Sequence, residues 1–275
     1  MHSARAPGKT ASVTAYLAVA LAALFAAGLT LYSGFGLGTL LLPVFALFYP
    51  VEVAVAATAV VHGANNVFKV SLVGKYADGV VVLRFGLTAI VATIAGAVLL
   101  GYLATVQREF AWSLGHWSGS TTPLKMIMGL LMLLFALFEL LPRFRSLEFD
   151  RKLLPLGGLL SGFFGGLSGH QGALRAAFLV KSGLSTEAFV GTSSVIGLLV
   201  DAVRIATYVL VVLSVGEKLE IPDGSLPLIT TGILAAFAGV LIGKRWLHKV
   251  KMRWVQTLTG VMLLLISILL GFGLI

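Results

Sequence analysis

Residues 165–172 read Gly-Gly-Leu-Ser-Gly-His-Gln-Gly, and they interrupt a long apolar run that resumes directly afterwards. Residues 33–38, with the sequence Ser-Gly-Phe-Gly-Leu-Gly, interrupt an earlier apolar run in the same way. Peptide groups freed by such a break at membrane depth have no water to bond, so they must line a cavity or be buried in protein. Paired breaks at corresponding places in two halves of a chain are typical of the substrate site of a transporter.

The composition is that of an integral membrane protein. Hydrophobic residues make up 58% and charged residues 11% of the 275 residues, and the mean hydropathy is +1.01, far above that of ordinary soluble domains. The formal net charge of +9 comes from basic residues placed between apolar segments, as juxtamembrane anchors are, so no nucleic-acid partner is expected. The chain has no cysteine and only five scattered histidines, so we expect neither a metal site nor a cofactor.

Apolar segments recur along the whole chain and predict an all-α fold with about eight of them. A membrane-spanning helix needs about 20 residues, and most of the segments approach this length. They lie near residues 12–49 (broken), 53–69, 82–105, 123–141, 153–182 (broken), 187–213, 226–246 and 254–274. We expect residues 1–145 and 146–275 to form two membrane repeats of a single transmembrane domain in a cell membrane, with the bacterial inner membrane as the expected location.

The positions of lysine and arginine predict which loops are cytoplasmic. The basic loops at 143–152 and 244–253 are expected inside, and the acidic loop at 217–223 outside. Because three apolar segments separate the two inside loops, segment 153–182 is expected to enter and leave on one side as a re-entrant hairpin. If segment 12–49 is also re-entrant, each half crosses three times and the halves form an inverted repeat. The alternative is a conventional arrangement of eight spans with a cytoplasmic amino terminus.

Similar residues recur at a separation of 135 positions, which supports two repeats. The matched pairs are Gly34 and Gly169, Glu52 and Glu187, Thr58 and Ser193, Asn66 and Asp201, and Lys69 and Arg204. The two glutamates stand near the start of a predicted helix, where a negative charge stabilises the helix amino terminus. Coupling to protons is the alternative role for them.

Polar residues form a stripe on one face of each of two predicted helices. In segment 53–69 they are His62, Asn65, Asn66 and Lys69, and in segment 187–213 they are Ser194, Gly197, Asp201 and Arg204. Residues three and four apart share a helix face, and ionisable groups within apolar spans nearly always face the bundle interior or a water-filled path. The simpler alternatives are that Asp201 and Arg204 only pair with each other, and that Lys69 extends to the membrane interface.

The second break concentrates polar groups that suit an anion. Ser168, His170, Gln171 and Arg175 lie within eight residues of an otherwise apolar region. Free backbone amides and the amino terminus of the following half-helix attract negative charge, and an arginine binds an oxyanion through two parallel hydrogen bonds. The region therefore predicts an oxyanion site.

Close helix packing is the alternative explanation for the glycines of this region. Gly158, Gly162 and Gly166 follow the spacing of small residues at helix interfaces. Packing accounts for these three glycines, but it does not account for Arg175 or His170.

These patterns give a set of candidate site residues. The expected substrate-binding residues are Gly36, Gly38, His62, Asn65, Asn66, Ser168, His170, Gln171, Arg175, Ser193 and Ser194. Asp201, Arg204 and Lys69 are expected to form a charge pair or to couple transport to protons or another ion. The expected partners are the lipid bilayer and a small anionic substrate, and the oligomeric state stays open.

Four stretches of the chain resemble the TauE/SafE family of membrane anion permeases. They are Gly-Phe-Gly-Leu-Gly-Thr-Leu-Leu-Leu-Pro at 34–43, Glu-Val-Ala-Val-Ala-Ala-Thr at 52–58, Gly-Gly-Leu-Ser-Gly-His-Gln-Gly-Ala-Leu-Arg at 165–175, and Leu-Ser-Thr-Glu-Ala-Phe-Val-Gly-Thr at 184–192. The resemblance covers nearly the whole chain and implies transport of sulfite, organosulfonates, other sulfur oxyanions or related carboxylates, often as export. Leu37 interrupts a glycine triplet common in the family, and His170-Gln171 stands in the matching region of the second half, so the particular substrate stays open.

The function expected from the sequence is therefore secondary transport of small anions, with sulfur oxyanions such as sulfite and sulfonates first, by alternating access around a site at the membrane midplane. An anion channel would share broken helices and polar stripes, and carboxylates or another small solute are alternative cargo. We do not expect an enzyme, because no compelling set of nucleophile, base or metal ligands stands in the sequence.

Overall fold

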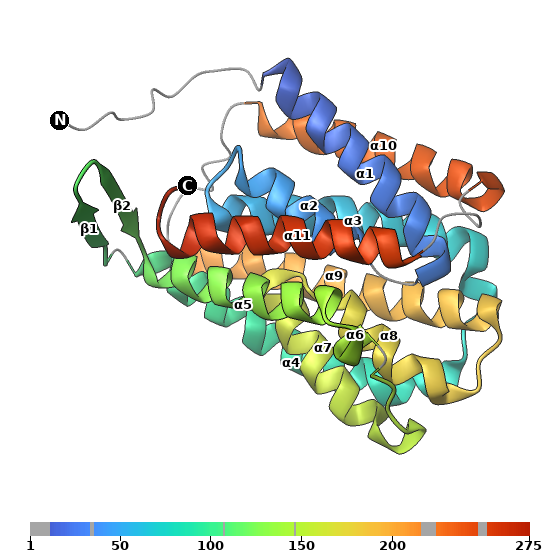
Figure 1. Ribbon diagram of the computed structural model, residues 1–275. Helices are drawn as coiled ribbons and strands as arrows, with labels where there is room; N and C mark the ends of the chain where they lie inside the picture. The colour runs from blue at the N-terminus through green and yellow to red at the C-terminus, as the bar shows by residue number, and fades with distance from the viewer. Residues whose placement is uncertain (1–11, 34–35, 107, 146, 216–223, 247–251) are drawn as a thin grey trace.

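The computed structural model describes residues 12–33, 36–106, 108–145, 147–215, 224–246 and 252–275, and nearly all of them are helical (Figure 1). The elements of the first half are α1 (Val13–Ser33), α2 (Leu37–Ala46), α3 (Val51–Val73), η1 (Gly74–Tyr76), α4 (Gly79–Thr105), β1 (Phe110–Leu114), β2 (Trp117–Thr121), α5 (Pro123–Leu140) and α6 (Pro142–Arg145). Those of the second half are η2 (Arg151–Leu153), α7 (Leu154–Ser168), α8 (Gly172–Leu179), η3 (Val180–Ser182), α9 (Thr186–Val215), α10 (Ser225–Trp246) and α11 (Met252–Gly271).

The all-α membrane fold expected from the sequence is confirmed. Six helices of the described residues are long and apolar enough to cross a membrane, namely α1, α3, α4, α5, α9 and α10. Both apolar runs that contain glycine breaks fold as two helices each, α1 with α2 and α7 with α8. The 10 residues of α2 and the 8 of α8 reach only about 15 and 12 Å at about 1.5 Å per residue, less than the hydrocarbon thickness of about 30 Å.

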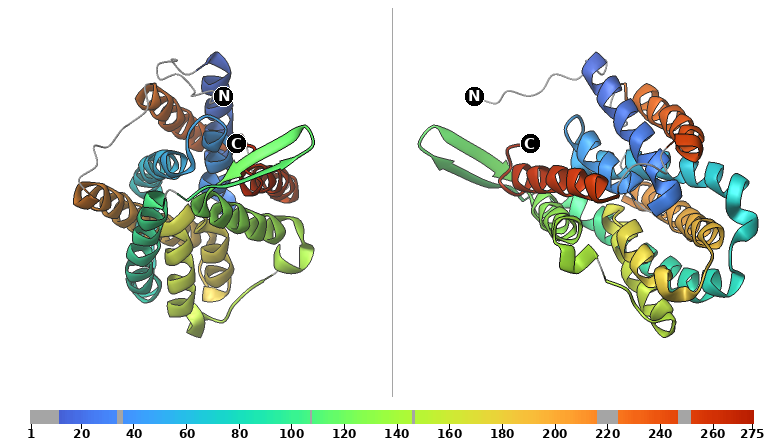
Figure 2. Two further views of the ribbon diagram at one scale, coloured as in Figure 1. Left: turned by 90° about the vertical axis from the view of Figure 1, so that its left-hand side faces the viewer. Right: turned by 45° about the vertical axis from the view of Figure 1, so that its right-hand side comes forward.

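The segment between α4 and α5 contains an antiparallel hairpin that the sequence did not predict. Strands β1 and β2 pair with Phe110 opposite Thr121, and the hairpin projects from one end of the helix bundle (Figure 2). The indole Nε1 of Trp112 donates a hydrogen bond of 2.8 Å to the carbonyl of Phe272, beyond α11. The hairpin thereby ties the end of the chain to the start of α5.

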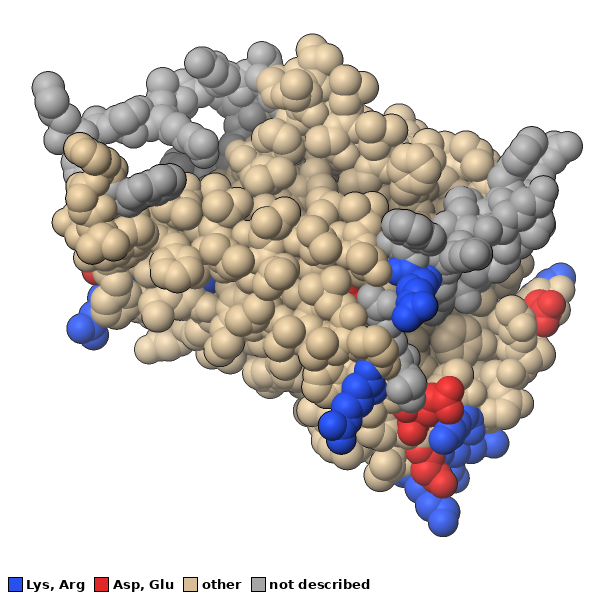
Figure 3. Space-filling model, viewed as in Figure 1, with Lys and Arg blue, Asp and Glu red and all other residues tan. Residues whose placement is uncertain are grey.

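On the face that Figure 3 shows, most charged side chains lie toward the ends of the molecule, with a largely uncharged belt between them. An exposed ion pair of 3.4 Å joins Lys181 to Glu148. The belt is what a helix bundle exposes to lipid, since charges there are costly. Several residues used above to predict the sidedness and the repeat lie outside the described residues: Gly34, Glu217, Glu220, Asp223, Lys249 and Lys251.

Helix pairing follows the correspondence between the two halves. Helix α8 begins 135 residues after α2, and α9 begins 135 residues after α3. On this correspondence α1 matches α7 and α4 matches α10, and α1 packs against α10 while α7 packs against α4. The central pairs are α3 with α9 and α5 with α11, each a helix beside its own counterpart. The opposite orientation of the two halves in a membrane stays a prediction.

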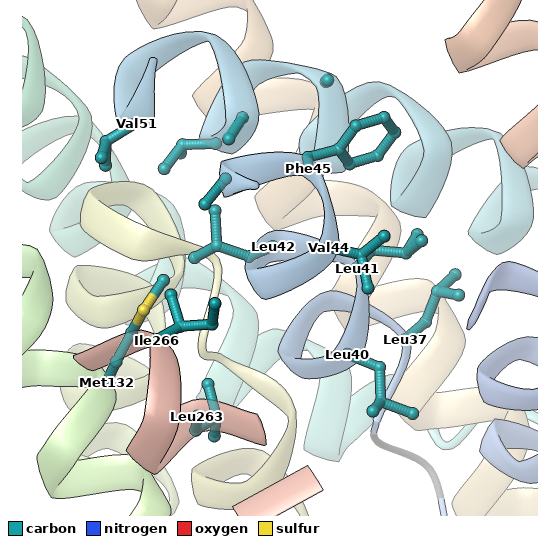
Figure 4. Close-up of a cluster of buried hydrophobic side chains, with 14 of the residues drawn as sticks. Leu37, Leu40, Leu41, Leu42, Val44, Phe45, Val51, Met132, Leu263 and Ile266 are labelled. Carbon is teal, nitrogen blue, oxygen red and sulfur yellow. The ribbon is translucent and has the colours of Figure 1, made fainter. Parts of the chain in front are cut away.

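Helix α2 lies in the core of the bundle. All ten of its residues are buried, and Figure 4 shows Leu42 directed toward Met132 of α5 and toward Leu263 and Ile266 of α11. An apolar helix can face either protein or lipid, and the burial of every residue shows that protein covers α2 on all sides. Surrounding helices therefore cover the backbone of this short helix, as the membrane interior requires.

The glycines of α7 pack directly on the backbone of α4, which confirms the packing role expected from their spacing. A methyl group added at Gly158, Gly162 or Gly166 would lie 2.2 Å from a carbonyl oxygen of α4 in each case. These oxygens belong to Phe85, Ala89 and Thr93, respectively. These distances leave no room for any side chain, so the two helices touch through their main chains.

Replacing Gly162 with alanine should therefore destabilise the protein. The added methyl meets backbone, which cannot turn aside, and overpacking of this kind costs about 1–3 kcal/mol. Thermal unfolding of the purified protein in detergent measures the effect. Gly79→Ala is the matched control, because nothing lies within 4 Å of its added methyl; equal melting temperatures for the two variants would contradict the close contact.

Candidate functional site

The two glycine breaks lie against each other in the middle of the bundle. A methyl group added at Gly38 would lie 3.0 Å from the carbonyl oxygen of Gly169 and 3.8 Å from the Cδ2 atom of His62. Gly36 and Gly169 have φ angles of 126° and 81°, which favour glycine because other residues are strained there. Segments that are far apart in the sequence thus bring unwound backbone to one place.

Side chains add hydrogen bonds to carbonyl groups on both sides of the second break, two of which also accept a bond from the main chain, Gly165 from Gly169 and Gln171 from Arg175. The hydroxyl of Ser161 donates a hydrogen bond of 2.9 Å to the carbonyl of Gln171. From α9, Arg204 Nη1 donates to the carbonyl of Gly165 at 3.3 Å, and the hydroxyl of Tyr208 donates to that of Gly166. The break is therefore satisfied by protein groups, as backbone at membrane depth requires.

A single carboxylate, that of Asp201, organises the centre of the site. Its Oδ2 atom lies 2.7 Å from Nδ1 of His62 and accepts a hydrogen bond of 2.7 Å from the amide of Asn66. Its Oδ1 atom accepts a hydrogen bond of 3.1 Å from Gln171 and lies 2.8 Å from Nη2 of Arg204. All five side chains are buried, so the carboxylate joins α3, α9 and the break between α7 and α8.

Arg175 continues this network into α8. Its Nη1 atom donates a hydrogen bond of 2.7 Å to Oε1 of Gln171, and its Nε atom donates one of 2.9 Å to the hydroxyl of Ser193. Arg175 is 1% exposed and lies in the first turns of a short helix that begins at Gly172. The guanidinium is thus held by neutral oxygens at a helix amino terminus, a setting that favours anions.

Lys69 is close to the same network. It is 2% exposed, and its charge interacts with those of Arg175 and Asp201. The interpretation that Lys69 extends to the membrane interface is therefore wrong. We define the central cluster as His62, Asn66, Lys69, Gln171, Arg175, Ser193, Asp201 and Arg204.

The remaining predicted site residues lie around the central cluster. His170 stacks on Phe135 of α5 with 4.7 Å between ring centroids, and its Nδ1 atom lies 3.0 Å from the hydroxyl of Ser168. Asn65 and Ser194 are buried on α3 and α9. The structure thus brings the two polar stripes and the second break together, while His170 lies toward α5.

Sequence reasoning missed several residues that take part in the site. Tyr208 bonds the carbonyl of Gly166, and the hydroxyl of Thr93 donates to that of Gly162 at 3.1 Å. Tyr208 lies four residues after Arg204, so helical spacing could have placed it on the same face. No pattern in the sequence marks Thr93 as a partner of α7.

A cavity of about 160 Å³ lies on the other side of α8, lined by residues of α5, α6, α8, α9 and α11. Its lining includes the polar residues Glu139 and Gln256. Arg175 belongs to the buried network described above, so α8 lies between this cavity and the central cluster.

A comparison with protein families agrees with this arrangement. The family model described as "Sulfite exporter TauE/SafE" matches residues 16–270, which is nearly the whole chain. The chain belongs to the TauE/SafE family. Members of this family are membrane transporters and not enzymes. No curated protein matches the chain in a sequence search.

The buried pair of Asp201 and Arg204 generates a prediction about stability. Asp201→Asn should lower the free energy of unfolding by about 3–5 kcal/mol, because it leaves a buried guanidinium without its carboxylate. The double variant Asp201→Asn/Arg204→Gln should lose less than the sum of its single variants. Thermal or denaturant unfolding in detergent measures each value.

Glu148→Gln is the control for this cycle, since it breaks the half-exposed pair with Lys181. Exposed pairs contribute about 0–1 kcal/mol. Additive effects of the two central substitutions would show that Asp201 and Arg204 do not stabilise each other.

Proposed function

We propose that this protein transports small sulfur oxyanions, such as sulfite and organosulfonates, across the cell membrane, by alternating access around the central cluster. One observation carries the proposal. Within the central cluster the cations Lys69, Arg175 and Arg204 accompany a single carboxylate, Asp201. The other buried carboxylate of the described residues, Glu139, lies on α5 beside Gly260 of α11. Surplus buried positive charge is costly without an anion, so the cluster favours one.

Arg175 would hold the oxyanion in this mechanism. Two of its partners, Gln171 and Ser193, are neutral, and they can exchange for substrate oxygens. An arginine binds such oxygens through two parallel hydrogen bonds, and the amino terminus of α8 adds its dipole. Asn65, Asn66 and Ser194 would complete the hydrogen bonds to the substrate.

Alternating access is supported by the way the two halves meet. Asn66 and Asp201 are 135 residues apart and are joined by a hydrogen bond of 2.7 Å. Equivalent positions can touch only where an approximate two-fold axis passes between them. A site on such an axis can open to either side when the surrounding helices tilt, which is the usual mechanism of transporters built from two repeats.

Export is the direction that we propose. At an inside-negative potential, outward movement of one negative charge gains about 2.3 kcal/mol per 100 mV, so export needs no coupled ion. Uptake would require a proton or a cation, for which His62 and Asp201 are candidates because they are in direct contact. The bacterial inner membrane is the location that suits this role.

Arg175→Ala should strongly reduce transport of sulfite in proteoliposomes while the protein still inserts and folds. The physical reason is the loss of the bidentate donor and of its charge, and losing one charge-assisted contact of about 1.5–3 kcal/mol reduces binding about tenfold to a hundredfold. Arg175→Lys should restore only part of the activity.

The control is Arg84→Ala, because Arg84 is an exposed arginine on α4. Normal sulfite flux through Arg175→Ala would refute the assignment of this residue. Flux that neither saturates nor shows counterflow would instead identify a channel.

A further inference from the structure

Lys69 carries a buried amino group that forms no ion pair with the described residues. Among the described residues no carboxylate lies within ion-pair distance of it, and its electrostatic neighbours are Arg175 and Asp201. Asp201 is already engaged on both oxygens by His62 and Asn66 and by Gln171 and Arg204. The carboxylate of Asp201 is thus already bonded to residues other than Lys69.

Comparison of the two halves explains how this imbalance arises. Arg204 follows Asp201 by three residues on α9, and the two side chains pair at 2.8 Å. Lys69 follows Asn66 by three residues on α3, so an amide stands where the second half has a carboxylate. The first half therefore keeps the cation of the pair and lacks its anion.

Two further polar side chains on the same face of α3 are also buried without partners. Asn65 is 0% exposed, and neither its amide nitrogen nor its amide oxygen has a hydrogen-bond partner in the described part of the chain. The same holds for the hydroxyl of Thr58, at 1% exposure. Thr58, Asn65 and Lys69 are seven and four residues apart and so share one helix face. Buried polar atoms without partners are rare in folded proteins, and a bound water, ion or ligand commonly satisfies them.

We propose that Lys69, with Asn65 and Thr58, binds a second negative charge of the substrate and makes the transporter selective for doubly charged oxyanions. This inference rests on the anion transport proposed above. The sulfite ion, sulfate and thiosulfate carry two charges, whereas methanesulfonate and other simple sulfonates carry one. Because no carboxylate of the described residues pairs with Lys69, the second charge of the substrate supplies its counter-ion.

The test compares sulfate with methanesulfonate, which share a tetrahedral sulfur and differ by one charge. Uptake of each labelled anion into proteoliposomes is measured at one pH for the wild-type protein and for Lys69→Met. In the wild type the apparent KM for sulfate should be at least about tenfold lower than for methanesulfonate. Lys69→Met should raise the KM for sulfate about tenfold to a hundredfold, the range of one charge-assisted contact, and change that for methanesulfonate less than about twofold.

Two further variants separate binding from folding. Lys75→Met makes the same substitution at an exposed lysine just after α3 and should leave both KM values unchanged. Lys69→Arg retains the charge and should retain the preference for sulfate. If Lys69→Met does not fold, Lys69→Gln is measured in its place, with a melting temperature to verify its fold.

The outcomes distinguish this inference from the function on which it rests. A wild-type protein that transports sulfite or methanesulfonate without preferring sulfate would overturn the role of Lys69 and leave anion transport intact. Equal losses for both anions in Lys69→Met would also overturn it. No flux of sulfite, sulfate or methanesulfonate through the wild type would instead reject the proposed function itself.

Discussion

The arrangement at the centre of this protein depends on the burial of one carboxylate. Asp201 is 0% exposed, and an ionised carboxylate in such a place is tolerated only when its oxygens are fully bonded. His62, Asn66, Gln171 and Arg204 meet this requirement. They come from three segments, so satisfying one charge fixes α3, α9 and the second glycine break relative to one another.

Close approach of these segments requires small residues around the carboxylate. A methyl group at Gly63 would lie 3.4 Å from the Cβ atom of Asp201, and one at Gly197 would lie 2.8 Å from the amide nitrogen of Asn66. Gly197 also stands opposite His62 in the repeat correspondence, so the first half carries an imidazole at a position where the second half has no side chain. The asymmetry continues in the short helices, where α2 has Leu40 at the position that corresponds to Arg175 of α8.

The sequence predicted the structure well wherever the membrane imposes a strong pattern of apolar or small residues. Long apolar runs predicted the helices, and the spacing of Gly158, Gly162 and Gly166 predicted contact with a neighbouring helix, which is α4. Helical spacing placed Asn66 on a polar face. Spacing does not show which residue of another helix a side chain contacts, or how deeply the side chain is buried in the bundle. For this reason the sequence did not predict the contact of Asn66 with Asp201, and it left two positions open for Lys69, the bundle interior and the membrane interface.

The hairpin was missed for a different reason. Residues 110–121 lie outside the long apolar runs, and each strand has only five residues, too few for a convincing alternation. Its register depends partly on hydrogen bonds to the end of the chain, such as the one from Trp112 to the carbonyl of Phe272. A local pattern cannot report a contact with a partner 160 residues away.

Pairing of α1 with α10 and of α4 with α7 also limits what can behave as a rigid body. In both pairs a helix of one half lies against a helix of the other, and glycines bring the main chains into contact, as Gly239 does with Leu24 and Gly162 with Ala89. Separating such surfaces would open voids that no lipid tail fills well. The two halves of the sequence are therefore interlocked. The parts able to tilt as units are helix pairs in which one helix comes from each half.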